Sequence, residues 1–166
     1  MSDPGYYDIV LRGNAMNLSS TNEMEKNQEK IQVVVFHLAG VEYAVEITFV
    51  EEINRFMNIT RVPHAPSYIE GVINLRGSII PIINLHKKFN LAGQKIDNST
   101  RIIVFKINDI EAAIIVDKVS EVIFLDISNI AKDTQFFSPI NAEVIEGMVK
   151  VEERLIIILD LLKLFD

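Results

Sequence analysis

An internal repeat limits what this chain can fold into more than any other feature of its sequence. Residues 31–53 align without a gap with residues 100–122, at an offset of 69. The remainder of each copy realigns at an offset of 76, so a unit of 59 residues, 31–89, recurs in 100–165 with seven residues inserted. The duplication predicts two similar substructures. The matched residues include Glu42 with Glu111, Val50 with Val119, Glu52 with Glu121, Ile69-Glu70-Gly71 with Ile145-Glu146-Gly147, and Phe89 with Phe165.

Each copy has the pattern of several strands followed by a short helix. Val33–Leu38 is an almost continuous apolar run, typical of a strand buried on both faces, and Ala39-Gly40 supplies a hairpin turn. A later pair of strands, 71–75 and 79–83, flanks a turn with a permissive glycine. Asn84 and Asp160 then precede leucines at helical spacing, and both residue types are good helix N-caps.

The composition favours strands over helices. Hydrophobic residues make up 49% of the chain but aromatic residues only 8%, so the apolar content is mostly Ile, Val and Leu. We therefore predict a mainly β fold with short helices, in which two small five-stranded SH3-like β-barrel subdomains are related by the duplication. The barrel copies span about 31–89 and 100–165, and strands either stay within their own copy or cross between the barrels.

The first 30 residues differ from the rest. They are rich in Asn, Ser, Glu and Gly without periodicity, which predicts a flexible N-terminal tail before a domain at 31–166. Residues 1–15 are either native or a remnant of an expression vector, with Met16 as the native start in the second case. The seven inserted residues fall in the polar stretch around 128–138, where a loop tolerates extra length.

Charge and hydropathy argue against nucleic-acid binding and membrane insertion. The net charge is −7, the pI is near 5.0, and the densest basic cluster is only Lys87-Lys88 beside His86. The longest apolar runs are far shorter than a bilayer span of about 20 residues, and no secretory signal is visible. Together with the absence of cysteine, this predicts a cytoplasmic protein that reaches a membrane only through partners.

No residue pattern indicates catalysis, a cofactor or a metal. The three histidines, His37, His64 and His86, lie on different predicted elements without carboxylates at ligand spacing. Nucleophile elbows and phosphate-binding glycine loops are missing. Neighbouring acids such as Glu51-Glu52 should point to opposite faces of a strand and so cannot act as an acid and base pair. The sequence therefore predicts a non-enzymatic binding module.

One segment resembles a known family. Residues 62–89, VPHAPSYIEGVINLRGSIIPIINLHKKF, are similar to the signature region of CheW-like chemotaxis coupling proteins, with its I-x-G-V-x-N-L-R-G-x-I-x-P-I pattern. The resemblance extends at lower density over 31–165, roughly four-fifths of the chain. The family usually has Asp where this chain has Asn84, a replacement that we expect to be neutral because both cap helices.

The resemblance implies a non-catalytic adaptor. CheW-like proteins bind the cytoplasmic tip of methyl-accepting chemoreceptors in a groove between subdomains, and the regulatory domain of the histidine kinase CheA barrel against barrel. Four positions carry over as protein-binding residues: Val50, Glu52, Gly71 and Arg76. For Gly71 and Val50, purely structural roles remain open, and Arg76 is either a contact residue or one half of a purely structural ion pair. We expect Glu52 and Arg76 to face each other.

Other functions are compatible with the same pattern. A CheV-like protein or another array coupler would share the barrel pair, although CheV proteins carry a receiver domain after it. A β-barrel that binds a small ligand is the alternative from a different class, and it would need polar groups that converge in a pocket.

Overall fold

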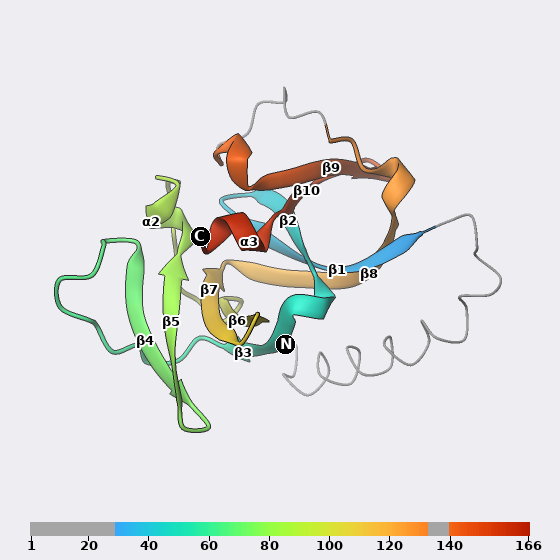
Figure 1. Ribbon diagram of the computed structural model, residues 1–166. Coiled ribbons are helices and arrows are strands. Elements are labelled where there is room, and N and C mark those ends of the chain that lie inside the picture. Colours follow the sequence, from blue (N-terminus) through green and yellow to red (C-terminus); the bar gives the residue numbers. More distant parts are fainter. Residues whose placement is uncertain (1–28, 133–139) are drawn as a thin grey trace.

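The computed structural model describes residues 29–132 and 140–166, and within these ranges ten strands form two five-stranded sheets. Figure 1 shows the two sheets as separate curved units, with α3 between them. Residues 1–28 of the predicted tail and positions 133–139 of the predicted insertion lie outside the described residues, whereas Lys30, which was predicted to belong to the tail, begins the first strand. The prediction of a mainly β fold with short helices is confirmed.

The elements follow the order expected from the repeat. Each copy contributes five strands and one short α-helix. The elements are β1 (Lys30–Leu38), β2 (Val41–Glu46), η1 (Ile47–Phe49), β3 (Val50–Arg55), β4 (Ile69–Leu75), β5 (Ser78–Asn84), α2 (Leu85–Lys88), β6 (Arg101–Ile107), β7 (Ile110–Val116), β8 (Lys118–Asp126), η2 (Ile127–Asn129), η3 (Ala142–Val144), β9 (Ile145–Val151), β10 (Arg154–Leu159) and α3 (Leu161–Leu164).

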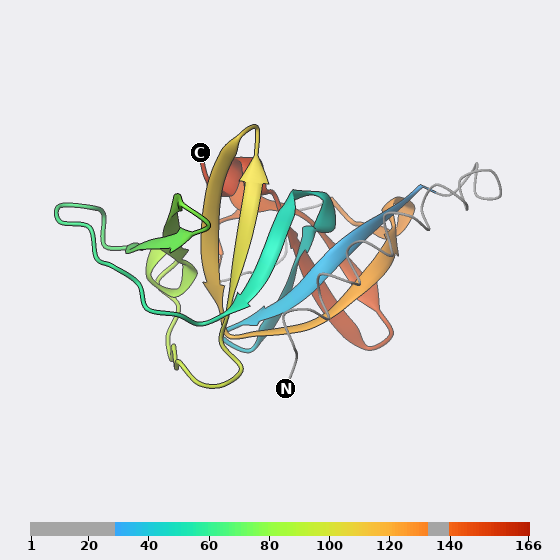
Figure 2. The same cartoon turned by 90° about the horizontal axis from the view of Figure 1, so that it is seen from below.

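Strands cross between the two copies of the repeat. The first sheet, here sheet A, has the order β8-β1-β2-β10-β9, and the second, sheet B, has the order β3-β6-β7-β5-β4. Each sheet thus combines the first two strands of one copy with the last three of the other. The two copies meet at four strand pairs, of which β1–β8 and β3–β6 are antiparallel and β2–β10 and β5–β7 are parallel. All the pairs within one copy are antiparallel. Figure 2 shows the long pair β1 and β8 of sheet A beside the β3–β6 pair of sheet B.

Backbone bridges join the edge strands and close both sheets. In sheet B, Thr60 exchanges two backbone hydrogen bonds of 3.0 and 2.8 Å with Val72 of β4. In sheet A, Ala131 exchanges bonds of 2.8 and 2.9 Å with Met148 of β9. Both bridging residues follow the opposite edge strand, β3 or β8. The bridges therefore turn each sheet into a small barrel, and we call each line of closure a seam.

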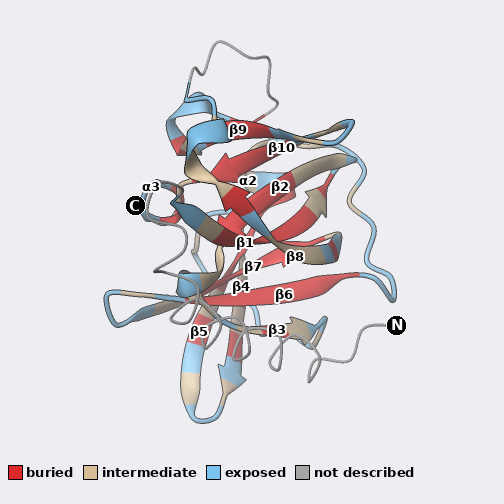
Figure 3. Cartoon of the chain, turned by 90° about the vertical axis from the view of Figure 1, so that its right-hand side faces the viewer, coloured by how far each residue is buried: buried red, intermediate tan, exposed pale blue. Residues whose placement is uncertain are grey.

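Buried side chains form three clusters, because strands buried on both faces supply two sets of side chains. One cluster fills the inside of sheet A, with Val33, Ala44 and Ile156 among its members, and another fills sheet B, with Val104 and Ile80. The largest lies between the sheets and draws on both copies. Figure 3 shows the buried residues concentrated in the strands of both sheets.

The short helices begin as their predicted caps require. The side chain of Asn84 accepts a hydrogen bond from the backbone N of Lys87 at 3.1 Å. Asp160 accepts from the backbone N of Leu162 and Lys163 at 3.1 and 3.3 Å. Both helices place leucines in the cluster between the sheets, so their burial against both sheets stabilises turns that are too short to persist alone.

A buried histidine links the two sheets. Nε2 of His86, in α2, lies 2.9 Å from Oδ1 of Asp117, the residue that connects β7 of sheet B to β8 of sheet A. Oδ2 of Asp117 also accepts a hydrogen bond of 2.8 Å from the backbone N of Ala39. The carboxylate thus ties α2 and the β1–β2 turn to the connection between the sheets.

Candidate protein-binding site

The four residues predicted to contact partners all belong to sheet B. Val50 and Glu52 lie in β3, Gly71 lies in β4, and Arg76 lies in the turn between β4 and β5. Because β3 and β4 are the two edge strands of this sheet, the four residues flank its seam. The fold therefore brings together residues that are separated by a long connection in the sequence.

Glu52 and Arg76 form an ion pair across the seam. Nη2 of Arg76 donates to Oε2 of Glu52 at 3.1 Å, and the two side chains are 80% and 20% exposed, respectively. The prediction that these charges face each other is confirmed. An ion pair this exposed contributes only about 0–1 kcal/mol to folding. The arginine consequently presents most of its guanidinium to solvent.

Gly71 and Val50 have roles within the fold itself. Gly71 has a φ of 151°, and a Cβ there would lie 2.2 Å from the carbonyl oxygen of Thr60, the residue that closes the seam. The repeat places Gly147 at the same point of sheet A, where a Cβ would lie 2.5 Å from Cγ2 of Ile130. Val50 is half-buried against the core between the sheets. The close backbone approach alone accounts for glycine at position 71.

Sheet A contains a second charged cluster that sequence reasoning missed. Arg154 donates from Nε and Nη2 to Glu42, at 3.2, 3.1 and 2.8 Å, and also from Nη2 to Glu121. These bonds raise the pKa of the Arg154 guanidinium, which keeps it charged. The signal was present in the repeat, because Glu42 aligns with Glu111 and Glu121 aligns with Glu52. What the alignment did not indicate is that the two glutamates share one arginine.

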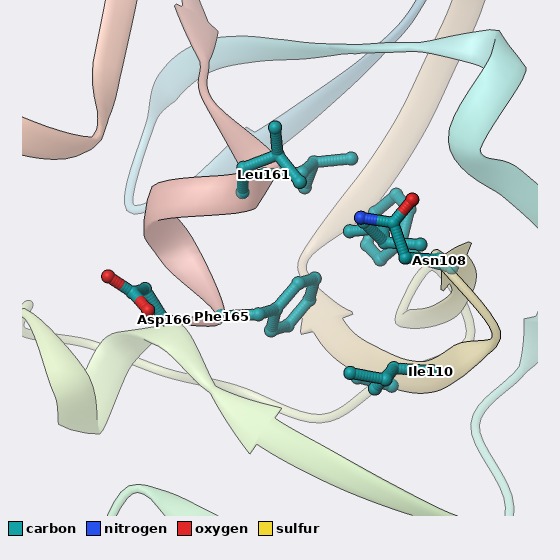
Figure 4. A pocket seen from close by; sticks show the side chains of 9 residues that line it. Asn108, Ile110, Leu161, Phe165 and Asp166 are labelled. Atoms are coloured by element: carbon teal, nitrogen blue, oxygen red, sulfur yellow. The ribbon is translucent and has the colours of Figure 1, made fainter.

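An apolar pocket of about 190 Å³ lies where the β6–β7 hairpin meets α3. Figure 4 shows Asn108 and Ile110 on the hairpin side of this space and Leu161 and Phe165 on the helix side. The rings of Phe105 and Phe165, which both line the pocket, pack against each other at an interplanar angle of 53° with their centroids 5.7 Å apart. Since β6 and β7 belong to sheet B and α3 follows β10 of sheet A, the pocket lies between the two sheets.

A second pocket of about 160 Å³ shares Leu161 and Leu162 with the first. Glu46, Glu146 and Asp160 also line it. Burial, followed by the charges of Glu46 and Asp160, raises the pKa of Glu146. The two pockets adjoin at Leu161 and Leu162, and together we call them the groove along α3, with one mainly apolar pocket and one lined by three acidic residues.

The described residues include no metal-binding cluster. Within 29–132 and 140–166, no group of three or more His, Asp or Glu side chains is arranged to hold a metal ion. In the same ranges, no helix is long and apolar enough to cross a membrane. The candidate contact surfaces are the charged seam on sheet B and the groove along α3.

The sequence of this chain matches one known protein family over most of its length. The family model of the CheW-like domain matches residues 32–166. The chain belongs to the CheW-like family. A chemotaxis protein CheW of Treponema pallidum is 35% identical over 146 residues, 86% of each chain. That of Bacillus subtilis is 40% identical over 129 residues, 78% of this chain and 83% of the relative.

A solved structure agrees with this CheW-like assignment. The crystal structure of the scaffolding protein TtCheW from Thermoanaerobacter tengcongensis matches with a TM-score of 0.73 and 37% identity, over 79% of this chain and 84% of that one. The CheW-like chain is accordingly a non-catalytic scaffold of chemotaxis signalling, as predicted. The family assignment does not identify the residues that contact partners. The seam of sheet B and the groove along α3 are the candidates for these contacts.

Proposed function

We propose that this chain couples methyl-accepting chemoreceptors to the histidine kinase CheA by holding the receptor tip and the kinase regulatory domain in one complex. It does so in the cytoplasm and reaches membrane-associated receptor arrays only through these partners. The kinase regulatory domain contacts sheet B at Val50, Glu52, Gly71 and Arg76. The receptor tip lies in the groove along α3.

The observation that carries this proposal is the ion pair between Glu52 and Arg76. Its N–O distance is 3.1 Å, but the arginine is 80% exposed, so the pair contributes little to stability. Stability therefore does not explain why two opposite charges occur at these positions. Recognition does, because a charged pair at a surface sets orientation and selects partners. Gly71 supports the same surface by allowing the seam to close beside it, and Val50 supports it by packing against the core between the sheets.

The groove along α3 supports the receptor contact. Ile110 is 68% exposed and Leu162 is 55% exposed at its rim, and the floor is made of Phe105, Leu161 and Phe165. Large apolar side chains exposed around a hollow are typical of a site that receives the apolar face of a helix. A receptor tip, which is a helical hairpin, has the shape that such a groove accepts.

Capture of both partners by the purified chain tests the proposal. We expect wild-type protein to retain a chemoreceptor cytoplasmic fragment and the CheA regulatory domain in a pull-down. Arg76→Ala and Glu52→Ala should leave the melting temperature nearly unchanged and weaken capture of the kinase domain, because each removes one charge of the pair. Lys150→Ala, which removes an exposed charge from sheet A, is the matched control and should bind like wild type.

Two results would count against the proposal. If wild type captures neither fragment and instead shifts its melting temperature with a metabolite, the chain is a ligand binder. If wild type captures both but Arg76→Ala and Glu52→Ala bind unchanged, the coupling function stands and the role of the ion pair is wrong.

A further inference from the structure

The two barrels carry acidic residues at equivalent positions, but only one barrel has an arginine between them. In sheet A, Arg154 binds Glu42 through two of its nitrogens and Glu121 through one of them. These three side chains continue the inner face of the barrel, because Glu42 and Arg154 lie two residues before Ala44 and Ile156 of the enclosed cluster. Arg154 thus closes the end of an apolar barrel with a charged network.

The strand registers fix the equivalent positions in sheet B. In each comparison, the equivalent residues pair with equivalent neighbours. Glu42 of sheet A pairs with His37, and its equivalent in sheet B, Glu111, pairs with Lys106. Glu121 of sheet A pairs with Val35, and its equivalent in sheet B, Glu52, pairs with Val104. Arg154 of sheet A pairs with Val151, and its equivalent in sheet B, Ser78, pairs with Leu75. The position of the arginine in sheet A is therefore occupied by a serine in sheet B, while both glutamates are retained.

The glutamates of sheet B are left incompletely paired. Arg76 reaches Glu52 from the hairpin turn with a single bond, and among the described residues no cation lies within 4 Å of the Glu111 carboxylate. Lys106 opposes Glu111 in the ladder without forming such a pair. Glu52 and Glu111 thus keep the positions that Glu42 and Glu121 have around Arg154, but the described part of sheet B has no arginine that they share. This indicates that another molecule supplies the cation.

A third carboxylate joins them because of a β-bulge. The register of β3 shifts between Val50 and Glu52, so the bulge interrupts the alternation expected for neighbouring acids. Partial burial, followed by hydrogen bonding to and charge repulsion from the Glu111 carboxyl, raises the pKa of Glu51, which places the two carboxyls near each other. The expectation that Glu51 and Glu52 point to opposite faces assumed regular alternation, which the bulge interrupts at Glu51.

We propose that Glu51, Glu52 and Glu111 form an acceptor site for an arginine side chain of the CheA regulatory domain, whose guanidinium takes the place that Arg154 has in sheet A. This inference rests on the proposed coupling function and names the chemistry of its kinase contact. Arginine fits better than lysine because Arg154 uses two nitrogens to bridge two carboxylates, which a planar fork allows and a single ammonium does not. The kinase fits better than the receptor because none of the three glutamates lines the groove along α3.

Supplying the arginine within the chain tests the acceptor site. In Ser78→Arg, the new side chain should bridge Glu52 and Glu111 as Arg154 bridges their equivalents. We expect the melting temperature to rise and the affinity for the CheA regulatory domain to fall by about tenfold or more, the loss expected for a charge-assisted contact. Binding of a chemoreceptor fragment should not change. Ser78→Gln, which has length without charge, is the control and should show neither effect.

Glu111→Gln keeps the inference testable if Ser78→Arg folds poorly. It should weaken kinase binding and also reduce the dependence of that binding on salt, because one charge pair is removed. Kinase affinity equal to wild type in both variants, beside a loss in Arg76→Ala, would reject the acceptor site and leave the coupling function in place. Loss of receptor binding rather than kinase binding would reject the kinase as the source of the arginine. Failure of wild type to bind either partner would instead reject the proposed function.

Discussion

At the scale of single residues, Gly71 and the two charged clusters show how one position can serve the fold or a partner. Gly71 lies where the seam of sheet B leaves no room for a side chain, so its presence follows from packing. Arg154 is 34% exposed and holds two carboxylates, whereas Arg76 is 80% exposed and holds one. Exposure and the number of partners therefore separate the arginine that stabilises a barrel from the one available for recognition.

The packing role of Gly71 predicts a large effect of a small substitution. In Gly71→Ala, the Cβ would meet the Thr60 carbonyl at 2.2 Å on backbone with a φ of 151°. Overpacking and backbone strain together should lower the free energy of unfolding by about 2–5 kcal/mol. Gly77→Ala is the matched control, because φ is +84° but no atom lies within 4 Å, so only about 1–2 kcal/mol of strain is expected. Equal losses in urea unfolding would contradict the steric explanation.

Sequence reasoning predicted these residues unevenly, and the reason is physical. The ion pair of Glu52 and Arg76 could be predicted because strand, turn and family position all restrict two unlike charges to one region. The network around Arg154 could not be predicted, since its three residues come from three strands of both copies. The resemblance implies a groove between the subdomains, but the residues that line the pocket at α3 were missed for the same reason, because the lining depends on which strands pair rather than on any local pattern.

At the scale of elements, the N-cap residues of the two short helices differ: α2 begins at an amide, Asn84, and α3 begins at a carboxylate, Asp160. Asn84 caps α2, as an aspartate would, but its Nδ2 also donates to Glu70 at 3.1 Å and to Gln94 at 2.8 Å, which an aspartate could not do. Burial opposes ionisation of Glu70, but the bonds from Lys87 and Asn84 outweigh it, so the pKa of Glu70 is lowered. At the equivalent place in the second copy, the pKa of Glu146 is raised.

The raised pKa of Glu146 predicts a dependence of stability on pH. Between the ordinary carboxyl pKa of 4.5 and the raised pKa of Glu146, the folded state binds more protons than the unfolded state. The free energy of unfolding therefore falls as the pH rises through this range. Glu146→Gln should therefore unfold at higher urea than wild type near pH 7, by less than about 1 kcal/mol because the residue is at the surface. The gain should vanish below about pH 4.

Urea unfolding of both proteins at the two pH values measures this difference. Glu153→Gln, in the exposed β9–β10 turn, is the control and should give the same small effect at both pH values. A gain for Glu146→Gln that is equally large in acid would show that shape rather than charge causes it.

At the scale of the whole molecule, the crossing of strands makes the two barrels one folding unit. The hydrophobic pattern predicted the strands and their order, because period and turn chemistry are local. It left open whether they stay within a copy, since both arrangements bury the same faces. The sheet order resolves this, because each barrel takes two strands from one copy and three from the other. The largest core cluster lies between the barrels and includes residues of both copies.

Shared strands and a shared core predict that both barrels unfold in a single transition. The sequence has no tryptophan, so one introduced tryptophan reports on one barrel. Ile79 in sheet B and Leu155 in sheet A are equivalent in the repeat, and they are 70% and 51% exposed, so Ile79→Trp and Leu155→Trp should both be tolerated. Fluorescence of the two variants in urea should give the same midpoint and the same slope, coincident with circular dichroism, because neither barrel retains a complete sheet once a copy unfolds. A lower midpoint at one tryptophan, with a plateau in the circular dichroism curve, would show instead that the barrels unfold independently and that the core between them does not couple them.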